Sequence, residues 1–255
     1  MISVNQARKL LSENLTRSEK QILPLKKCLG LFLSENVFSP IDVPSFDNSA
    51  KDGYAIKFNN KNDFYKLQYT VQAGDSTTYQ LSEGEAARIF TGAKMPKGAD
   101  TVIPQEIVEK DDKNKKISFQ TEKINIGSNV RYQGSQCKKG DLIAKTGTKI
   151  TPGAIGLLAS VGLAEVPVFC SPRICFIITG DELKEIGSAL QEGEIYNSNG
   201  PMLEALLKNL GMEEILALKA ADDKETLQQT INTALEATDV LLLSGGISVG
   251  DYDFV

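Results

Sequence analysis

Three groups of acidic residues follow predicted buried strands, and they are the side chains best placed to do chemistry. They are Asp181 with Glu182, Asp222 with Asp223, and Asp251 with Asp253. Parallel strands end at one edge of a sheet, so these acids are expected to converge there. Like charges gathered at a surface repel by about 1 kcal/mol per close pair, and a cation such as Mg²⁺ would relieve that repulsion. The alternative is that Asp222 and Asp223 only cap a helix and that the other acids are solvated.

A glycine turn, Ser244-Gly245-Gly246, leaves the last of these strands. The apolar run before it is too short for a membrane span and fits the centre of a parallel sheet. Glycines add no side-chain bulk, so the backbone N–H groups of the turn can approach a phosphate. A tight turn without a ligand is the alternative for the glycines taken alone.

A second polar cluster lies in a β-prone region, between Asp47 and Gly53. It includes Ser49 and Asp52, and a similar turn follows a later strand at Thr91 and Gly92. Surface Asx turns would explain the first cluster in most proteins. Lys94 and Lys97 beyond the second turn could hold an anion, although solvated lysines are commoner.

Composition excludes several classes of protein. The chain has 255 residues and no histidine, which excludes serine–histidine and cysteine–histidine catalysis and disfavours a transition-metal site. Its net charge of −5 argues against nucleic-acid binding. The N-terminal residues lack the basic segment and apolar run of a signal peptide, so a cytoplasmic protein is expected. Four cysteines without CxxC spacing are expected to be core residues rather than ligands or disulfides.

The pattern of apolar residues predicts the elements that position these groups. Residues 3–15 form a helix with a Ser3–Gln6 capping box. Short β-prone runs fill residues 40–140, with a hairpin tip at 111–116. Thr151 caps a helix that begins at Pro152, and a strand over 163–169 lies at a sheet edge because of Pro167. From Arg173 the order is βαβαβ, with Asn199 as the N-cap of the first helix, which implies a parallel sheet.

These elements predict a chain of α/β plus mainly-β class with several domains. Residues 1–18 form a helix that packs on the α/β domain. Residues 19–40 and 141–171 form a small mixed domain, into which a β-rich domain of residues 41–140 is inserted. Residues 172–255 form an α/β domain with a parallel sheet.

Six ordered motifs resemble one family along essentially the whole chain, the molybdopterin molybdenumtransferases (MoeA and the E domain of gephyrin). They are residues 42–55, 88–93, 98–106, 179–182, 195–199 and 244–250. The resemblance implies an elongated chain with a three-layer, MogA-like C-terminal domain that binds molybdopterin. It also implies a transferase that inserts molybdate into adenylylated molybdopterin, releases AMP and depends on a divalent cation, with Mg²⁺ expected.

By this resemblance, individual residues acquire expected roles. The catalytic set is Asp52, Thr91, Glu182, Asp222 and Asp253. Of these, Glu182, Asp222 and Asp253 would hold the cation. The substrate-binding set is Ser49, Gly92, Thr179, Gly180, Asp181, Asn199, Ser244, Gly245, Gly246, Ser248 and Gly250. The family implies a homodimer whose clefts each take residues from both subunits, and contact with the molybdopterin adenylyltransferase. Neither nucleic acid nor membrane is expected as a partner.

The sequence departs from the family in three places. Lys51 stands where the family usually has Met, and Ser135-Gln136 replaces a common acidic pair. The sequence stops at Val255, where the family's α/β domain continues, so a fragment or a shortened protein is expected. Two alternatives therefore stay open: a non-catalytic module that binds a pterin nucleotide or acts as a scaffold, and a nucleotide-binding protein of the adenylyltransferase type.

Overall fold

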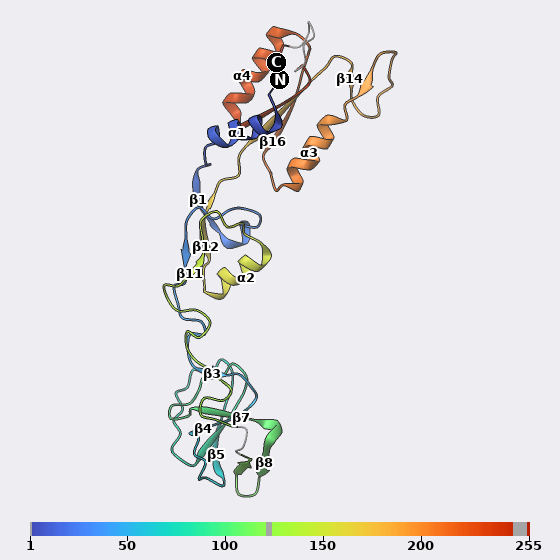
Figure 1. Ribbon diagram of the computed structural model, residues 1–255. Coiled ribbons are helices and arrows are strands. Elements are labelled where there is room, and N and C mark those ends of the chain that lie inside the picture. The colour runs from blue at the N-terminus through green and yellow to red at the C-terminus, as the bar shows by residue number, and fades with distance from the viewer. Residues whose placement is uncertain (1, 121–123, 247–253) are drawn as a thin grey trace. The chain divides into compact units, whose positions relative to one another are not determined.

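The computed structural model describes residues 2–120, 124–246 and 254–255. Its contacts divide the chain into two units (Figure 1). The α/β unit comprises residues 1–35, 145–155 and 164–255, and the β unit comprises residues 36–144 and 156–163. Hydrophobic clusters occur within each unit. No helix within the described ranges is both long and apolar enough to cross a membrane.

The α/β unit contains the predicted βαβαβ succession. Its elements are β13 (Ile174–Thr179), α3 (Asn199–Asn209), β16 (Ile215–Ala220), α4 (Lys224–Ala237) and β17 (Val240–Ser244). The strands form a parallel sheet in the order β16-β13-β17. The expectation that the last strand is central is wrong for this sheet. β13 is central and buried at every position, whereas β17 is half-buried.

Alternating side chains of β13 give this domain three layers. Cys175 and Ile177 pack in one cluster with Leu227 of α4. Ile174, Phe176 and Ile178 pack in another with Leu207 of α3. Successive side chains of a strand point to opposite faces, so the two helices cover opposite faces of the sheet (Figure 1). This is the architecture expected of a MogA-like domain.

Capping fixes where α3 and α4 begin. The predicted N-cap of α3, Asn199, is wrong, because the cap is Ser198 and its side chain makes no capping bond. The side chain of Asn197 instead accepts a hydrogen bond from the Gly200 N–H, at 3.0 Å. α4 has the expected acidic start, since the Asp223 carboxylate accepts from the Thr226 N–H at 2.8 Å. Before α3, β14 (Leu183–Lys184) pairs with β15 (Ile195–Tyr196).

The remaining elements of the α/β unit are small. α1 (Val4–Asn14) has the predicted capping box of Ser3 and Gln6, and none of its residues is buried. Its packing on the α/β domain remains a prediction. β1 (Lys20–Pro24) pairs with β12 (Glu165–Phe169) in a two-stranded sheet, so Pro167 lies on an edge strand as expected. The 3-10 helix η1 (Leu25–Lys27) follows β1.

Thr151 and Pro152 begin a helix as predicted. α2 (Pro152–Ser160) starts where the Thr151 hydroxyl accepts a hydrogen bond from the Ala154 N–H, at 3.2 Å.

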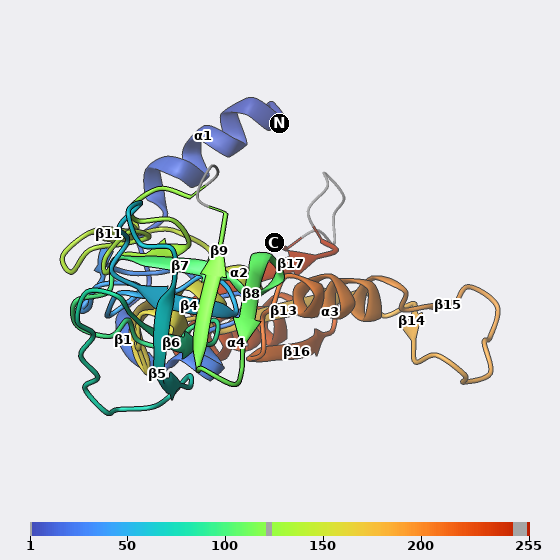
Figure 2. The ribbon, with the colours of Figure 1, turned by 90° about the horizontal axis from the view of Figure 1, so that it is seen from below.

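A six-stranded mixed sheet forms most of the β unit. Its order is β7-β4-β6-β5-β9-β8, and only β5 and β6 are parallel. The strands are β4 (Gly53–Ile56), β5 (Tyr65–Val71), β6 (Glu85–Ile89), β7 (Thr101–Pro104), β8 (Val108–Asp111) and β9 (Lys116–Phe119). β8 and β9 form the predicted hairpin (Figure 2).

Shorter elements complete the β unit. β2 (Val37–Phe38) pairs with β11 (Leu142–Ala144), and β3 (Asn48–Ser49) pairs with β10 (Val130–Arg131). The 3-10 helix η2 (Gln105–Ile107) follows β7.

Candidate functional site

In the β unit, the structure joins Asp52 and Thr91, which are 39 residues apart in the sequence. One carboxylate oxygen of Asp52, Oδ1, accepts two hydrogen bonds from Thr91. The backbone N–H and the side-chain hydroxyl each donate at 2.8 Å. Asp52 precedes β4 and Thr91 follows β6, and these strands are paired. The antiparallel register therefore brings the two predicted catalytic residues together.

The backbone around this pair is tightly packed. A Cβ added to Gly53 would lie 2.1 Å from the Ile103 carbonyl oxygen, so only glycine fits there. Gly92 donates its N–H to the Ser49 carbonyl at 2.8 Å, which places the two predicted binding residues side by side. The Ser49 hydroxyl accepts from the Lys51 N–H at 3.2 Å and is buried. Ser49 and Gly92 thus support the loop, Gly92 through its backbone N–H and Ser49 through both its carbonyl and its hydroxyl.

These hydrogen bonds keep Asp52 ionised. The Thr91 backbone N–H, then the Thr91 hydroxyl, and then the positive charge of Arg88 lower the pKa of the Asp52 carboxyl below its ordinary value. Hydrogen bonds to the charged form of a carboxyl favour that form. Oδ1 is occupied by Thr91, so Oδ2 is the atom of this side chain that remains for a ligand.

In the α/β unit, the end of β13 approaches the glycine turn that follows β17. A Cβ on Gly245 would lie 2.4 Å from the Thr179 hydroxyl oxygen, and one on Gly246 would lie 3.5 Å from it. Both glycines have positive φ, of 103° and 59°. The turn therefore needs glycine for its conformation and, at Gly245, for the close approach to Thr179.

The Thr179 hydroxyl is a buried polar group for which the described residues supply no hydrogen-bond partner. Thr179 is 4% exposed, and its Oγ1 lacks any partner among the described residues. Such a group costs free energy, and a ligand atom beside the turn would satisfy it. Gly180 is buried next to it with φ of 137°, and a Cβ there would lie 2.7 Å from a Glu182 carboxylate oxygen.

Two acids at this edge have structural partners: Asp222 bonds the end of β13, and Asp223 caps α4. Asp222 accepts a hydrogen bond from the Asp181 N–H through its Oδ2, at 3.2 Å, which joins the end of β13 to the end of β16. Asp223 caps α4, so the capping alternative holds for Asp223. Hydrogen bonds from Thr226 lower the pKa of the Asp223 carboxyl. The side chains of Asp181 and Glu182 are exposed.

Asn199 also reaches this edge. Its side-chain amide donates to the Ser244 hydroxyl at 3.1 Å, which links the start of α3 to the end of β17. The residue predicted as a helix cap is therefore a bridge to the glycine turn.

Ser248, Gly250, Asp251 and Asp253 lie outside the described residues. Within the part of the chain that the structure covers, no three acidic or cysteine side chains are grouped closely enough to hold a metal ion. Carboxylates are the correct donor type for Mg²⁺, but the described residues do not assemble a cation site.

Sequence reasoning missed Arg88 and the side chain of Gln105. Arg88 donates to the Gly53 carbonyl at 2.7 Å and to the Gln105 side-chain oxygen at 2.5 Å. Both acceptors adjoin the Asp52 loop, since the Gln105 N–H also donates to the Asp52 carbonyl at 3.0 Å. A charged residue between apolar neighbours, in the run Ala86-Ala87-Arg88-Ile89 of β6, was the available signal.

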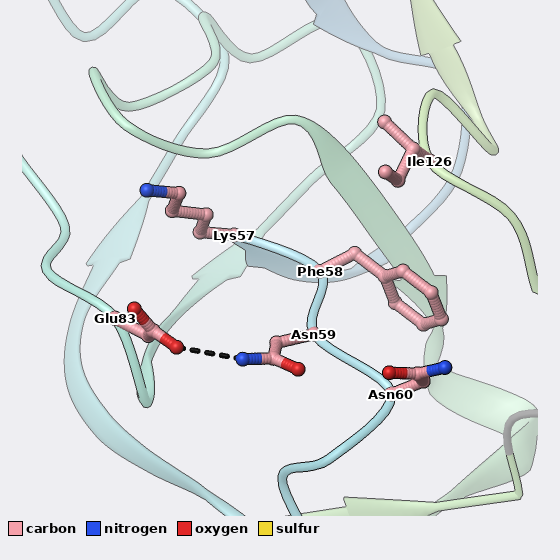
Figure 3. A pocket seen from close by; sticks show the side chains of 6 residues that line it. All are labelled: Lys57, Phe58, Asn59, Asn60, Glu83 and Ile126. Atoms are coloured by element: carbon pink, nitrogen blue, oxygen red, sulfur yellow. Dashed lines mark hydrogen bonds between the residues drawn. The ribbon is translucent and has the colours of Figure 1, made fainter.

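A depression of about 350 Å³ in the β unit contains none of the candidate residues. It is lined by Lys57, Phe58, Asn59, Asn60, Glu83 and Ile126 (Figure 3). The Asn59 side chain points to Glu83 and donates to it at 2.6 Å, so these two polar groups are already paired. The depression is therefore separate from the chemistry.

Comparison with known proteins finds relatives along nearly the whole chain. Residues 2–162 match the family described as "MoeA N-terminal region (domain I and II)", and residues 175–255 match a "Probable molybdopterin binding domain". A molybdopterin molybdenumtransferase of Staphylococcus aureus is 36% identical over 241 residues, which are 91% of this chain and 56% of that protein. One of Haemophilus influenzae is 35% identical over 257 residues, which are 100% and 63%.

A solved structure has the same fold. The molybdopterin biosynthesis MoeA protein of Pyrococcus horikoshii OT3 matches with a TM-score of 0.85 and 29% identity, over 96% of this chain and 66% of that one. The chain thus spans between about half and two thirds of the length of these relatives. Because the MoeA N-terminal model alone covers more than half of the chain, the chain belongs to the MoeA family.

Proposed function

We propose that this chain serves molybdenum cofactor synthesis as part of a molybdopterin molybdenumtransferase. The reaction inserts molybdate into adenylylated molybdopterin and releases AMP. Molybdate and the pterin nucleotide are the substrates. The proposal rests on two supports: the relatives named as molybdopterin molybdenumtransferases, and an edge of the α/β unit suited to a phosphate.

The Thr179 hydroxyl is the observation that carries this proposal. It is buried, unpartnered in the described structure and next to two glycines of positive φ. Glycine turns expose backbone N–H groups to anions, and a hydroxyl can add one hydrogen bond to a phosphate oxygen. The adenylylated substrate carries such oxygens at the bond that is cleaved.

The Asp52–Thr91 pair supplies a fixed negative charge in the β unit. The pair cannot act as a general acid near neutral pH, because the low pKa keeps Asp52 ionised. We propose that Asp52 orients a bound cationic or hydrogen-bond-donating group of the substrate complex. Thr91 holds the carboxylate in position for that task.

Glu182, Asp222 and Asp253 are proposed to hold Mg²⁺. A bound cation would neutralise phosphate charge when it is present. Magnesium titration of the turnover rate tests the requirement: saturable activation supports it, and full activity in a chelator such as EDTA contradicts it.

Thr179→Val in the full-length protein tests the assignment. Binding of adenylylated molybdopterin, measured by calorimetry, is expected to weaken about tenfold through the loss of one hydrogen bond. Thr233→Val is the matched control, because the Thr233 hydroxyl bonds within α4, to the Gln229 carbonyl. Binding unchanged in Thr179→Val would remove Thr179 from the site.

The same assay separates a transferase from a binding module. Turnover with AMP release supports the transferase, and binding of the pterin nucleotide without turnover supports the non-catalytic module. ATP-dependent AMP transfer would instead indicate an adenylyltransferase.

A cytoplasmic homodimer that works with the molybdopterin adenylyltransferase is also proposed. Mixing Asp52→Ala chains with Glu182→Ala chains tests shared clefts: partial recovery of activity is expected from mixed dimers. Activity that stays at the level of the separate variants would contradict shared clefts.

A further inference from the structure

We propose that Arg88 is a positioning residue, which holds the Asp52 loop against Thr91 through contacts on both sides of the pair. This role deepens the function proposed above and rests on it where turnover is concerned. Its hydrogen bonds go to protein atoms around Asp52, so it is argued to act through the Asp52–Thr91 pair.

The first support is the place of Arg88 in the sheet. On β6 it pairs directly with Tyr54 of β4, so the two side chains lie on one face of the sheet. Tyr54 is two residues beyond Asp52, and Arg88 is three residues before Thr91. The arginine is therefore located where the two segments that carry the pair run side by side.

The second support is the set of hydrogen bonds. Nη1 donates to the Gly53 carbonyl at 2.7 Å, and Nη2 donates to the Gln105 side-chain oxygen at 2.5 Å. Gln105 in turn donates its backbone N–H to the Asp52 carbonyl at 3.0 Å. The planar guanidinium thus links Gly53, which follows Asp52, to Gln105, whose N–H bonds the Asp52 carbonyl.

The third support is ring packing. The guanidinium carbon lies 5.1 Å from the centre of the Tyr54 ring and 4.7 Å from that of Phe90. Phe90 directly precedes Thr91, so this contact also holds the segment that carries Thr91. Cation–π contacts favour Arg over neutral residues at such a place.

The fourth support is charge. Within the described part of the chain, Arg88 forms no ion pair with a carboxylate. The nearby charged residues include Lys51 in the Asp52 loop, Glu106 in η2 and Lys110 on β8, whose Nζ lies 5.8 Å from the centre of the Tyr54 ring. The same and adjoining strands also carry Glu85 on β6, Lys66 on β5, and Glu109 and Asp111 on β8. Of the charged groups, Arg88 is the one that lowers the pKa of Asp52. Its charge acts on Asp52 although its hydrogen bonds go to neutral atoms.

Arg88→Gln and Arg88→Lys separate charge from shape. In the Gln variant, the ¹³C NMR titration of the Asp52 carboxyl carbon is expected to move to higher pH, because the positive charge is lost. In the Lys variant the charge remains, but the pair of guanidinium nitrogens that bonds Gly53 and Gln105 is lost. There, hydrogen exchange of the Thr91 and Gln105 amides is expected to accelerate about tenfold. The Lys97 amide, bonded to the Tyr79 carbonyl, should keep its rate.

Lys116→Gln is the matched control. Lys116 also lies over an aromatic ring, that of Phe64 at 3.7 Å, but its charge lowers the pKa of Asp111 instead. The Lys116 variant should therefore move the Asp111 titration to higher pH and leave that of Asp52 unchanged. Arg88→Gln should move the Asp52 titration to higher pH and leave that of Asp111 unchanged.

Turnover of the full-length protein gives the last readout. In Arg88→Lys, kcat is expected to fall about a hundredfold through misplacement of the pair, with a smaller change in KM. If the wild-type protein lacks transferase activity, the proposed function fails, while the NMR results still decide the role of Arg88. Unchanged Asp52 titration in the Gln variant and unchanged amide exchange in the Lys variant would overturn that role. So would unfolding of both variants, which would make Arg88 a structural part of the sheet.

Discussion

The two groups of candidate residues differ in how their polar atoms are satisfied. In the β unit, the Asp52 carboxylate, the Thr91 hydroxyl and the Arg88 guanidinium bond to one another or to nearby backbone. At the edge of the α/β unit, the Thr179 hydroxyl is buried and has no partner in the described structure. The first group is hydrogen-bonded within the protein except at Asp52 Oδ2, whereas the described residues leave the buried Thr179 hydroxyl without a bond.

This difference separates two ways of building a site. A closed network is rigid before a ligand arrives, so its geometry is fixed by the protein. An unpaired buried hydroxyl lowers stability until a ligand binds. We infer that the β unit supplies positioning and that the α/β edge supplies affinity.

Gly53→Ala should disrupt the hydrogen-bonded group around Asp52 in the β unit. The added Cβ would collide with the Ile103 carbonyl within the sheet, so a loss of about 3 kcal/mol in the free energy of unfolding is expected. Denaturant unfolding measures it. Gly156→Ala in α2 is the control, since nothing lies within 4 Å of its Cβ position. That change should stabilise by about 0.5–1 kcal/mol, and equal effects of the two variants would contradict the tight approach at Gly53.

At the edge of the α/β unit, Asp222→Asn should show whether Asp222 acts in turnover, in contrast to Asp223, which caps α4. The Asn side-chain oxygen can still accept from the Asp181 N–H, so the fold is kept while the charge is lost. Turnover of the full-length protein is expected to fall about a hundredfold. Asp223→Asn should leave turnover near the wild-type value, because Asn caps helices as well as Asp does. Wild-type turnover in Asp222→Asn would remove Asp222 from the site.

The same substitution should change stability in opposite directions in the two units. Thr179→Val removes a buried hydroxyl that no described residue bonds, so a gain of up to about 1 kcal/mol is expected. Thr91→Val removes a bond to Asp52 and should lower the melting temperature. Calorimetry of both variants measures the two signs. A loss of stability in Thr179→Val would show that its hydroxyl has a partner and would end the comparison.

The smallest expected effect is a dependence on pH. The folded-state pKa of Asp52 is lowered, so its contribution to stability is present above the unfolded-state value of about 4 and is lost as pH falls through the folded value. The melting-temperature difference between wild type and Thr91→Val should therefore be largest near neutral pH and shrink in acid. A difference that stays constant from pH 7 to pH 2 would contradict the role of the carboxylate.

Much of the fold could be predicted because periodicity and capping are local properties. The helix over Val4–Asn14 and the parallel strands from Ile174 onward follow from such patterns. Strand order is not local, which is why the most apolar terminal run was placed at the centre and β13 occupies it instead. The error at Asn199 has a local cause instead: two asparagines lie close together, and Asn197 is the one whose side chain bonds the helix start.

The candidate site could be predicted only as a set of segments. Topology brings Asp222 to Asp181, but it does not say that Asp223 turns away to cap α4. Arg88 was missed because its role depends on the cross-strand register with Tyr54, which the sequence does not encode locally. The pairing of Asp52 with Thr91 required the same register.

The pairing of β2 with β11 has a consequence for how the chain is assembled. Val37–Phe38 and Leu142–Ala144 are hydrogen-bonded neighbours, although about a hundred residues separate them along the chain. The two paired strands are thus joined as in a hairpin, but the connection between them is a folded region rather than a short turn. Because the ends of the insert lie side by side, its length can vary without altering the distance that the flanking segments must span.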